Sequence, residues 1–277
     1  MRFTFLGTGA AEGIPSPFCS CPACTDARLT GGKNVRRRQS VLINDDLLVD
    51  LGPDVFASCA AFGISLTGLR HVLITHSHLD HFSPDNLKLR ARGFRLETEL
   101  PEIDAAGPPS VWMKWEESGG SDREAGIRRR PVLPGSRFEL GAYRIRSLPA
   151  VHQLRTGDAM NYVIDDGTAT LLYASDTGYY EEEVWKELEG YRFDTVIMEG
   201  TLGFRSSGRE HLNFGDLGRM MERLEKIGAI GRETVRIATH FSHQSVEPYE
   251  ETCRTLKAMG IECAFDGLTR QAGNRSR

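Results

Sequence analysis

Short runs of β-branched and apolar residues recur along the chain and predict a protein that is rich in strands. Two of the links between runs, Asn44-Asp45-Asp46 and Asp166-Gly167, are short enough for hairpins, so part of the sheet is expected to be antiparallel. The ten predicted strands are RFTFLG (2–7), SVLIND (40–45), LLVDLG (47–52), HVLIT (71–75), YRIRSLP (143–149), NYVIDD (161–166), TLLYASD (170–176), TVIMEG (195–200), VRIATH (235–240) and ECAFDG (262–267).

Helical periodicity is predicted mostly in the second half of the chain. In 215–227, apolar residues that include Met220 and Met221 repeat at helical spacing, so both methionines are expected to pack in the core rather than bind a metal. A second helix is expected to begin near Ser245 and to end at Gly260, and a third to span about 181–189.

The segment 117–130, ESGGSDREAGIRRR, is polar and contains glycines, so it is predicted to be a mobile loop. Two β-rich halves, each covered by helices, favour one α/β domain over residues 1–277. We expect a four-layer αββα sandwich with mixed sheets rather than a doubly wound parallel sheet.

The composition narrows the class of protein. A chain of 277 residues with 40% hydrophobic content can bury a large core, and its net charge of −4 makes nucleic acid an unlikely partner. No apolar run approaches the 18 residues of a membrane span, and no export signal precedes the first strand, so we expect a cytoplasmic protein without a membrane partner. Six cysteines are then expected to be reduced, and either bind metal or lie in the core.

The strand HVLIT (71–75) runs directly into four side chains that commonly bind metals: His76, His78, Asp80 and His81. Alternation in an extended chain sends His76 and His78 to the same side, while the following turn can direct the other two to a second point nearby. Four such donors suit two adjacent metals better than one.

Three more donors follow predicted strands: His152 after YRIRSLPAV, Asp176 at the end of TLLYASD, and His240 at the end of VRIATH. The ends of strands are where a scaffold usually presents functional side chains. His71, in contrast, is interpreted as a structural residue.

This set resembles the signature of the metallo-β-lactamase superfamily, HxHxDH followed by a distant His, a distant Asp and a final His. The resemblance implies the αββα fold and two divalent metals, zinc or manganese with iron also compatible, that hold a hydroxide between them. It assigns one metal to His76, His78 and His152, the other to Asp80, His81 and His240, a bridging role to Asp176, and the ordering of the ligand loop to Asp50. Turnover is expected to depend on Asp80 and Asp176.

Other residues bear on the substrate. His211, in REHLNFGDL, either protonates a leaving group or caps the helix at 215–227. Arg205 and Arg209 either bind a phosphate or are solvated loop residues, and the same two interpretations hold for RRRQS (36–40).

Within the superfamily, the chain resembles the PhnP-type cyclic-phosphate phosphodiesterases of phosphonate breakdown, through GTGAAEGIP, CSCPAC, RRQS, THSHLDH, SDT (175–177), THFSHQ (239–244) and FDG (265–267). This implies a small phosphorylated substrate, 5-phosphoribosyl 1,2-cyclic phosphate or a 2′,3′-cyclic nucleotide, with His211 as the acid. The alternatives are an endoribonuclease of the tRNase Z type, an acyl hydrolase or lactonase, and a non-catalytic metal-binding protein similar to PqqB. The oligomeric state, a homodimer included, is left open.

The segment PFCSCPACTD (17–26) holds Cys19, Cys21 and Cys24, none of which the ligand motif uses. The remaining histidine of a motif, His243, would complete a Cys₃His tetrahedron for a structural zinc. The PhnP resemblance implies the same set, and the alternative is free buried thiols. Dinucleotide binding by GTGAAEG is disfavoured, because Pro15 and Pro17 prevent the helix that should follow.

Overall fold

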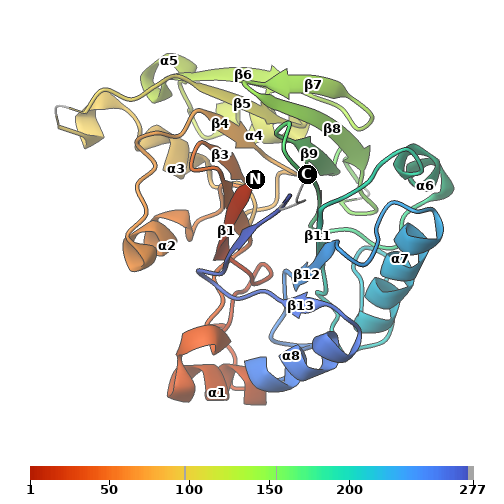
Figure 1. The fold of residues 1–277 in the computed structure, drawn as a ribbon. Helices are drawn as coiled ribbons and strands as arrows, with labels where there is room; N and C mark the ends of the chain where they lie inside the picture. The colour runs from red at the N-terminus through yellow and green to blue at the C-terminus, as the bar shows by residue number, and fades with distance from the viewer. Residues whose placement is uncertain (97, 154, 274–277) are drawn as a thin grey trace.

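The computed structural model describes residues 1–277 except 97, 154 and 274–277, and it contains two seven-stranded sheets (Figure 1). The first has the order β14-β1-β2-β3-β4-β5-β6 and the second the order β13-β12-β11-β10-β9-β8-β7. The strands of the first sheet are β1 (Arg2–Gly7), β2 (Ser40–Ile43), β3 (Leu47–Val49), β4 (His71–Leu73), β5 (Ile103–Gly107), β6 (Ile127–Pro131) and β14 (Thr269–Gln271). Those of the second are β7 (Arg137–Leu140), β8 (Tyr143–Pro149), β9 (Met160–Asp165), β10 (Thr170–Ala174), β11 (Thr195–Glu199), β12 (Val235–Thr239) and β13 (Glu262–Cys263).

Both sheets are mixed. The predicted hairpins β2–β3 and β9–β10 are confirmed as antiparallel pairs, and Asn44 and Asp45 in the first turn have positive φ angles of 47° and 66°. Adjacent strands within the run β3 to β6, and likewise within β10 to β13, are parallel to one another. β1 lies between β2 and β14, so the last strand along the chain forms an edge of the first sheet.

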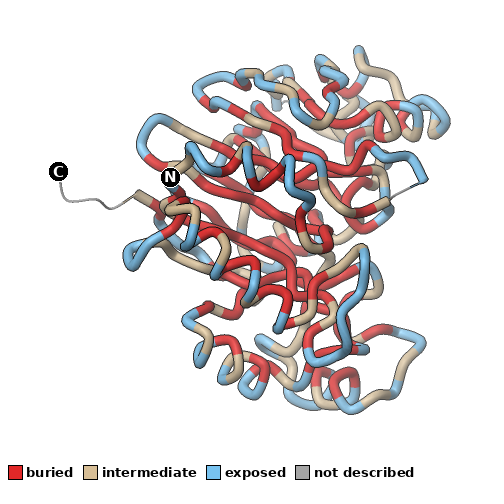
Figure 2. The backbone as a smooth tube through the Cα atoms, turned by 90° about the vertical axis from the view of Figure 1, so that its right-hand side faces the viewer, coloured by how far each residue is buried: buried red, intermediate tan, exposed pale blue. Residues whose placement is uncertain are grey.

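Alternation along the strands produces three apolar layers. In β1, Phe3 and Phe5 pack between the two sheets, whereas Leu6 belongs to the cluster on the outer face of the first sheet. A third cluster joins the outer face of the second sheet to α6, α7 and α8. Burial of one such side chain contributes roughly 1.5–3 kcal/mol. Figure 2 shows the buried residues concentrated in the middle of the molecule, with most exposed residues at its periphery, and the predicted αββα sandwich is confirmed.

The expectation that helices lie mostly in the second half is wrong. Five of the eight α-helices among the described residues precede β7; they span nine residues or fewer, and three begin at a proline, so none presents a long periodic pattern. The helices are α1 (Pro22–Thr30), α2 (Val55–Phe62), α3 (Pro84–Lys88), α4 (Pro109–Glu117), α5 (Asp122–Ala125), α6 (Glu182–Leu188), α7 (Phe214–Lys226) and α8 (Tyr249–Ala258).

The start of α8 differs from the prediction, whereas the buried face of α7 agrees with it. α8 begins at Tyr249 rather than near Ser245, because Pro248 occupies the N-cap position. On α7, Met220 and Met221 are buried in the core, as predicted. No α-helix in the described part of the chain is long and apolar enough to cross a membrane.

The segment 117–130 is not the loop that its composition predicts, because α5 and most of β6 lie within it. Its polar side chains pair with one another instead of remaining in solvent. The Ser121 hydroxyl caps α5 by accepting a hydrogen bond from Glu124 N, and Asp122 accepts one from Arg129 Nε at 2.6 Å. Polar content alone therefore misidentified an edge strand and its preceding helix.

Candidate metal centre

The first metal-binding side chains lie in the loop after β4 that carries HSHLDH (76–81). Asp50, which follows β3, orders this loop: its Oδ1 accepts hydrogen bonds from Thr75 N and Oγ1 at 2.8 and 2.9 Å, and its Oδ2 lies 2.8 Å from His81 Nδ1. A Cβ atom on Gly52 would overlap the carbonyl oxygen of Asp80. Only glycine therefore lets the two loops approach this closely.

Three further donors come from the second sheet. His152, Asp176 and His240 follow β8, β10 and β12, so both sheets contribute to one site. Asp176 and His240 have left-handed backbone conformations, with φ angles of 49° and 57°. Such conformations cost a non-glycine residue about 1–3 kcal/mol and cluster at functional sites.

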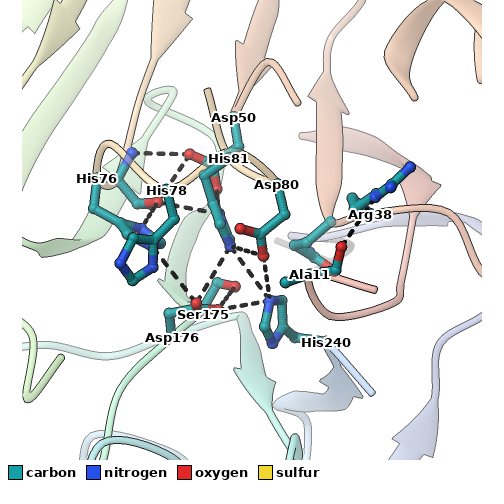
Figure 3. A network of polar contacts seen from close by, with 12 residues as sticks. Ala11, Arg38, Asp50, His76, His78, Asp80, His81, Ser175, Asp176 and His240 are labelled. Atoms are coloured by element: carbon teal, nitrogen blue, oxygen red, sulfur yellow. Dashed lines mark hydrogen bonds and ion pairs between the residues drawn. The ribbon is translucent and has the colours of Figure 1, made fainter. Parts of the chain in front are cut away.

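The donors form two groups that share Asp176. All of them except His152 are labelled in Figure 3. The first group adds His76, His78 and His152, and the second adds Asp80, His81 and His240; within each, the donor atoms lie within 4.8 Å of one another. Asp176 Oδ2 lies 3.6 Å from His76 Nε2 and 3.3 Å from His81 Nε2, and Oδ1 lies 2.9 Å from His240 Nε2. Asp176 thus faces both groups.

The ring nitrogens that face away from the site have partners, which fixes how each ring is turned. His78 is the exception: it directs Nδ1 inward, 3.1 Å from His152 Nε2. The other pairs are His76 Nδ1 with Thr75 Oγ1 (3.0 Å), His81 Nδ1 with Asp50 Oδ2 (2.8 Å), His152 Nδ1 with the Glu210 carbonyl (3.3 Å) and His240 Nδ1 with Thr201 Oγ1 (2.8 Å).

These residues fit two divalent cations. His76 Nε2 is buried and has no hydrogen-bond partner among the described residues, a situation that costs about 1–3 kcal/mol unless something else binds the atom. Imidazole and carboxylate donors suit zinc, manganese and iron. The first group would hold one cation and the second group the other.

The charges of the site support metal binding. Burial lowers the pKa of His76, which favours the neutral imidazole that binds a metal. Burial also opposes charge on His240, but the Asp176 carboxylate outweighs it and raises the pKa of His240 to about 10. A cation must displace that proton, so we expect metal affinity to increase with pH.

His211 lies beside both groups, with its ring 4.8 Å from that of His152 and 6.1 Å from that of His240, centroid to centroid. It is not the cap of α7, because Asn213 accepts the hydrogen bond from Asp216 N. Its Nδ1 lies 2.8 Å from Oε1 of the fully buried Glu199. Burial lowers the pKa of His211, but Glu199 outweighs burial and raises it to about 9.

The cysteine loop forms a separate cluster. The donor atoms of Cys19, Cys21, Cys24 and His243 all lie within 4.8 Å of one another. Burial raises the pKa of the Cys21 thiol, but hydrogen bonds from the Cys24 backbone and from His243 outweigh it and lower the pKa to about 7. Three thiolates and one imidazole are a closed set for tetrahedral zinc.

The beta-lactamase superfamily domain matches residues 46–241, a span that contains Asp50 and every donor of the two groups. The chain belongs to the metallo-β-lactamase superfamily.

Similar proteins cover nearly the whole chain. Coenzyme PQQ synthesis protein B from Methylobacterium sp. (strain 4-46) is 26% identical over 305 residues, which cover 97% of this chain and 99% of that protein. Among solved structures, a new diphosphatase from the PhnP family has a TM-score of 0.74 at 23% identity, covering 98% of this chain and 97% of that one. Zn(2+)-bound PqqB from Methylobacterium extorquens has a TM-score of 0.75 at 18% identity, covering 98% and 100%. At these identities the two structures show a shared fold alone.

Two acidic residues of this metallo-β-lactamase superfamily protein were missed at the sequence level. Glu199 lies in TVIMEG (195–200) and is the last residue of β11, a strand-end position like that of Asp176, and this signal could have identified it. Glu12 lies in the first loop, and its Oε1 is 3.4 Å from His243 Nε2. No local pattern connects Glu12 with a histidine 231 positions later.

The arginines predicted to bind a phosphate do not belong to either of the two donor groups. Arg205 and Arg209 are exposed; Arg205 Nε donates to the Gln244 carbonyl at 2.8 Å, and the Arg209 side chain has no recorded partner in the described part of the chain. Within RRRQS, Arg36 is buried and donates to Thr8 Oγ1 and the Ala264 carbonyl. Arg36 therefore stabilises the fold, whereas RRRQS was predicted either to bind a phosphate or to lie on the surface.

Replacement Asp50→Asn is expected to weaken metal binding by roughly 10- to 100-fold, because the amide cannot accept from both Thr75 and His81 as the carboxylate does. Chelator competition with the purified variant measures this. Asp54→Asn is a matched control, since Asp54 pairs with Arg38 and contacts no donor. Equal affinities in both variants would contradict a role for Asp50 in ordering the ligand loop.

Proposed function

We propose that this protein is a metal-dependent phosphodiesterase that opens a small cyclic phosphate, such as 5-phosphoribosyl 1,2-cyclic phosphate or a nucleoside 2′,3′-cyclic phosphate. The observation that carries the proposal is the His211–Glu199 pair beside the two donor groups. Opening such a ring expels an alkoxide, which needs a proton from an acid. Similarity to a PhnP-family diphosphatase supports phosphoryl chemistry in general.

The donor groups define what the chain contributes. Two divalent cations, zinc, manganese or iron, would supply a water nucleophile at neutral pH and neutralise charge on the phosphate oxygens. His76, His78 and His152 would hold one cation, Asp80, His81 and His240 the other, and Asp176 would face both. We also propose zinc for the Cys₃His cluster.

His211 is held in one orientation by a carboxylate that cannot easily move. Besides His211 Nδ1, Glu199 accepts hydrogen bonds from the backbone N–H groups of Thr177, Thr201 and Leu212 at 2.7, 3.2 and 3.1 Å. With Nδ1 engaged, His211 keeps Nε2 for the substrate. We propose that this atom donates its proton to the leaving oxygen.

A tRNA-processing role has less support. The basic segment GIRRR (126–130) does not form a free arm, because its arginines have partners within the protein. Arg128 pairs with Asp104 at 2.5 Å, Arg129 with Glu116 at 2.7 Å, and Arg130 donates to the Glu139 carbonyl at 3.1 Å.

A metal-binding role without catalysis is the second candidate, favoured by the similarity to coenzyme PQQ synthesis protein B over nearly the whole chain. Two complete donor groups with an adjacent His211 favour catalysis instead. Metal analysis separates the candidates: a chain that retains only the zinc of the cysteine cluster under every loading condition would support the binding role.

Replacement His211→Ala is expected to slow the opening of cyclic phosphates about 100-fold, because an alkoxide leaves without protonation. Hydrolysis of bis(p-nitrophenyl) phosphate, whose phenolate leaves readily, should fall less than about tenfold. Steady-state kinetics on both substrates measures the difference, and metal content confirms that the site is intact. Equal losses would argue against His211 as the acid.

The wild-type protein should be assayed beside this variant on a panel of diphosphate, pre-tRNA, lactone and thioester substrates. Preferred cleavage of a lactone or thioester would replace the proposal with acyl hydrolysis. Salt-sensitive pre-tRNA binding with cleavage, and no turnover of cyclic phosphates, would replace it with tRNA processing.

A further inference from the structure

Lys114, on α4, contacts the ligand loop at both of its ends. Its Nζ donates hydrogen bonds to the carbonyl oxygens of Ser77 and Phe82 at 2.7 and 2.8 Å. Between these two carbonyls lie His78, Asp80 and His81, donors of both groups. One half-buried ammonium group therefore spans the segment that supplies donors for both cations.

The helix that carries Lys114 is itself fixed to the protein. Trp112 and Trp115 are buried, and their Nε1 atoms donate to the Gly107 carbonyl and to Asp122 Oδ1 at 3.0 and 2.8 Å. At the start of α4, Ser110 donates through N and Oγ to the Asp158 carboxylate at 2.9 and 3.0 Å. Lys114 thus projects from a rigid support.

α4 also links the two loops that supply the three histidines of the first donor group. Asp158 lies on the same connection between β8 and β9 as His152, and Gln153 Nε2 donates to Ser77 Oγ at 2.8 Å. The helix is therefore tied near its start to the segment of His152 and in its middle to the loop of His76 and His78. A shift of α4 would change the spacing of all three donors.

We propose that Lys114 is a positioning residue for the metal pair: it holds the carbonyls of Ser77 and Phe82 at a set distance and so keeps the loop between them in its metal-binding shape. A neutral apolar side chain would leave both carbonyls without this donor and let the loop relax. Lys114 reaches no donor atom directly, so its effect is expected on metal affinity rather than on which atoms bind.

The test is a titration of metal-free protein with Co²⁺, followed by competition with a chelator. Absorption from thiolate-to-cobalt charge transfer reports the cysteine cluster, and the d–d bands of the histidine and carboxylate site report the pair. Lys114→Met is expected to weaken binding at the pair by roughly 10-fold and to leave the cysteine cluster unchanged. Lys114→Arg, which keeps two N–H donors, should recover most of the loss.

Lys88→Met is the matched control, because Lys88 is also half-buried and donates to a carbonyl, that of Ser118, outside the ligand loop. It should bind Co²⁺ as the wild type does. Wild-type affinity in Lys114→Met, or a loss of equal size in Lys88→Met, would overturn the proposal. If Lys114→Met does not fold, Lys114→Arg and Lys114→Gln carry the comparison: equal affinity in these two would also overturn it. Metal affinity is measured without substrate, so the result is independent of which ester the protein hydrolyses.

Discussion

Asp176→Asn is expected to lower kcat/KM by at least about 1,000-fold, on the order of 4 kcal/mol of transition-state stabilisation. Asp176 faces both donor groups, with Oδ2 3.6 Å from His76 Nε2 in the first group and Oδ1 2.9 Å from His240 Nε2 in the second. An amide has one oxygen and no charge, so it cannot serve two cations as the carboxylate can. Steady-state kinetics with metal analysis measures both consequences.

The control for Asp176→Asn is Asp216→Asn. Asp216 is also buried, but it lies on α7 and pairs with Arg219. It should retain activity and both active-site cations. Wild-type turnover by Asp176→Asn with a full complement of metal would contradict the shared role of this residue.

Cys21→Ser is expected to remove one zinc per chain and to lower the unfolding free energy by several kcal/mol. Structural zinc sites have apparent binding free energies on the order of 10 kcal/mol, and a serine hydroxyl does not replace a thiolate ligand. The cluster ties the first loop to His243, three residues after His240, so its loss is also expected to loosen the active site. Metal analysis and denaturant unfolding measure the two effects.

Cys59→Ser is the matched control for this variant, because Cys59 lies on α2 outside the cluster, and burial raises its thiol pKa. It should keep the full zinc content. If Cys21→Ser also retained it, the cluster would not be a metal site.

The donors could be predicted from sequence because they are chemically conspicuous and stand at the ends of strands. His76 to His81 are dense in one loop, and His240 follows the clear strand VRIAT. The αββα sandwich could be predicted because both halves of the sequence are rich in strands and contain helices that can cover a sheet.

Other features depended on contacts that local patterns do not contain. The role of Glu199 depends on the position of β11 between β10 and β12. In this position the loop after β11 brings His211 within hydrogen-bond distance of Glu199. Segment 117–130 is ordered because Asp122 accepts hydrogen bonds from Arg129 and Trp115. The composition of a segment does not show which of its polar side chains pair with one another. Short helices such as α3 owe their stability to packing and not to intrinsic propensity.

The position of β14 beside β1 has a consequence for biosynthesis. The chain emerges from the ribosome with His76 to His81 long before His240, His243 and β14. Until then the second cation lacks His240, the cysteines lack their fourth ligand, and the first sheet lacks an edge strand. We therefore expect the second donor group and the cysteine cluster to bind metal only after His240 and His243 have emerged, and chaperones to have their longest opportunity to act on the first sheet while this edge is unpaired.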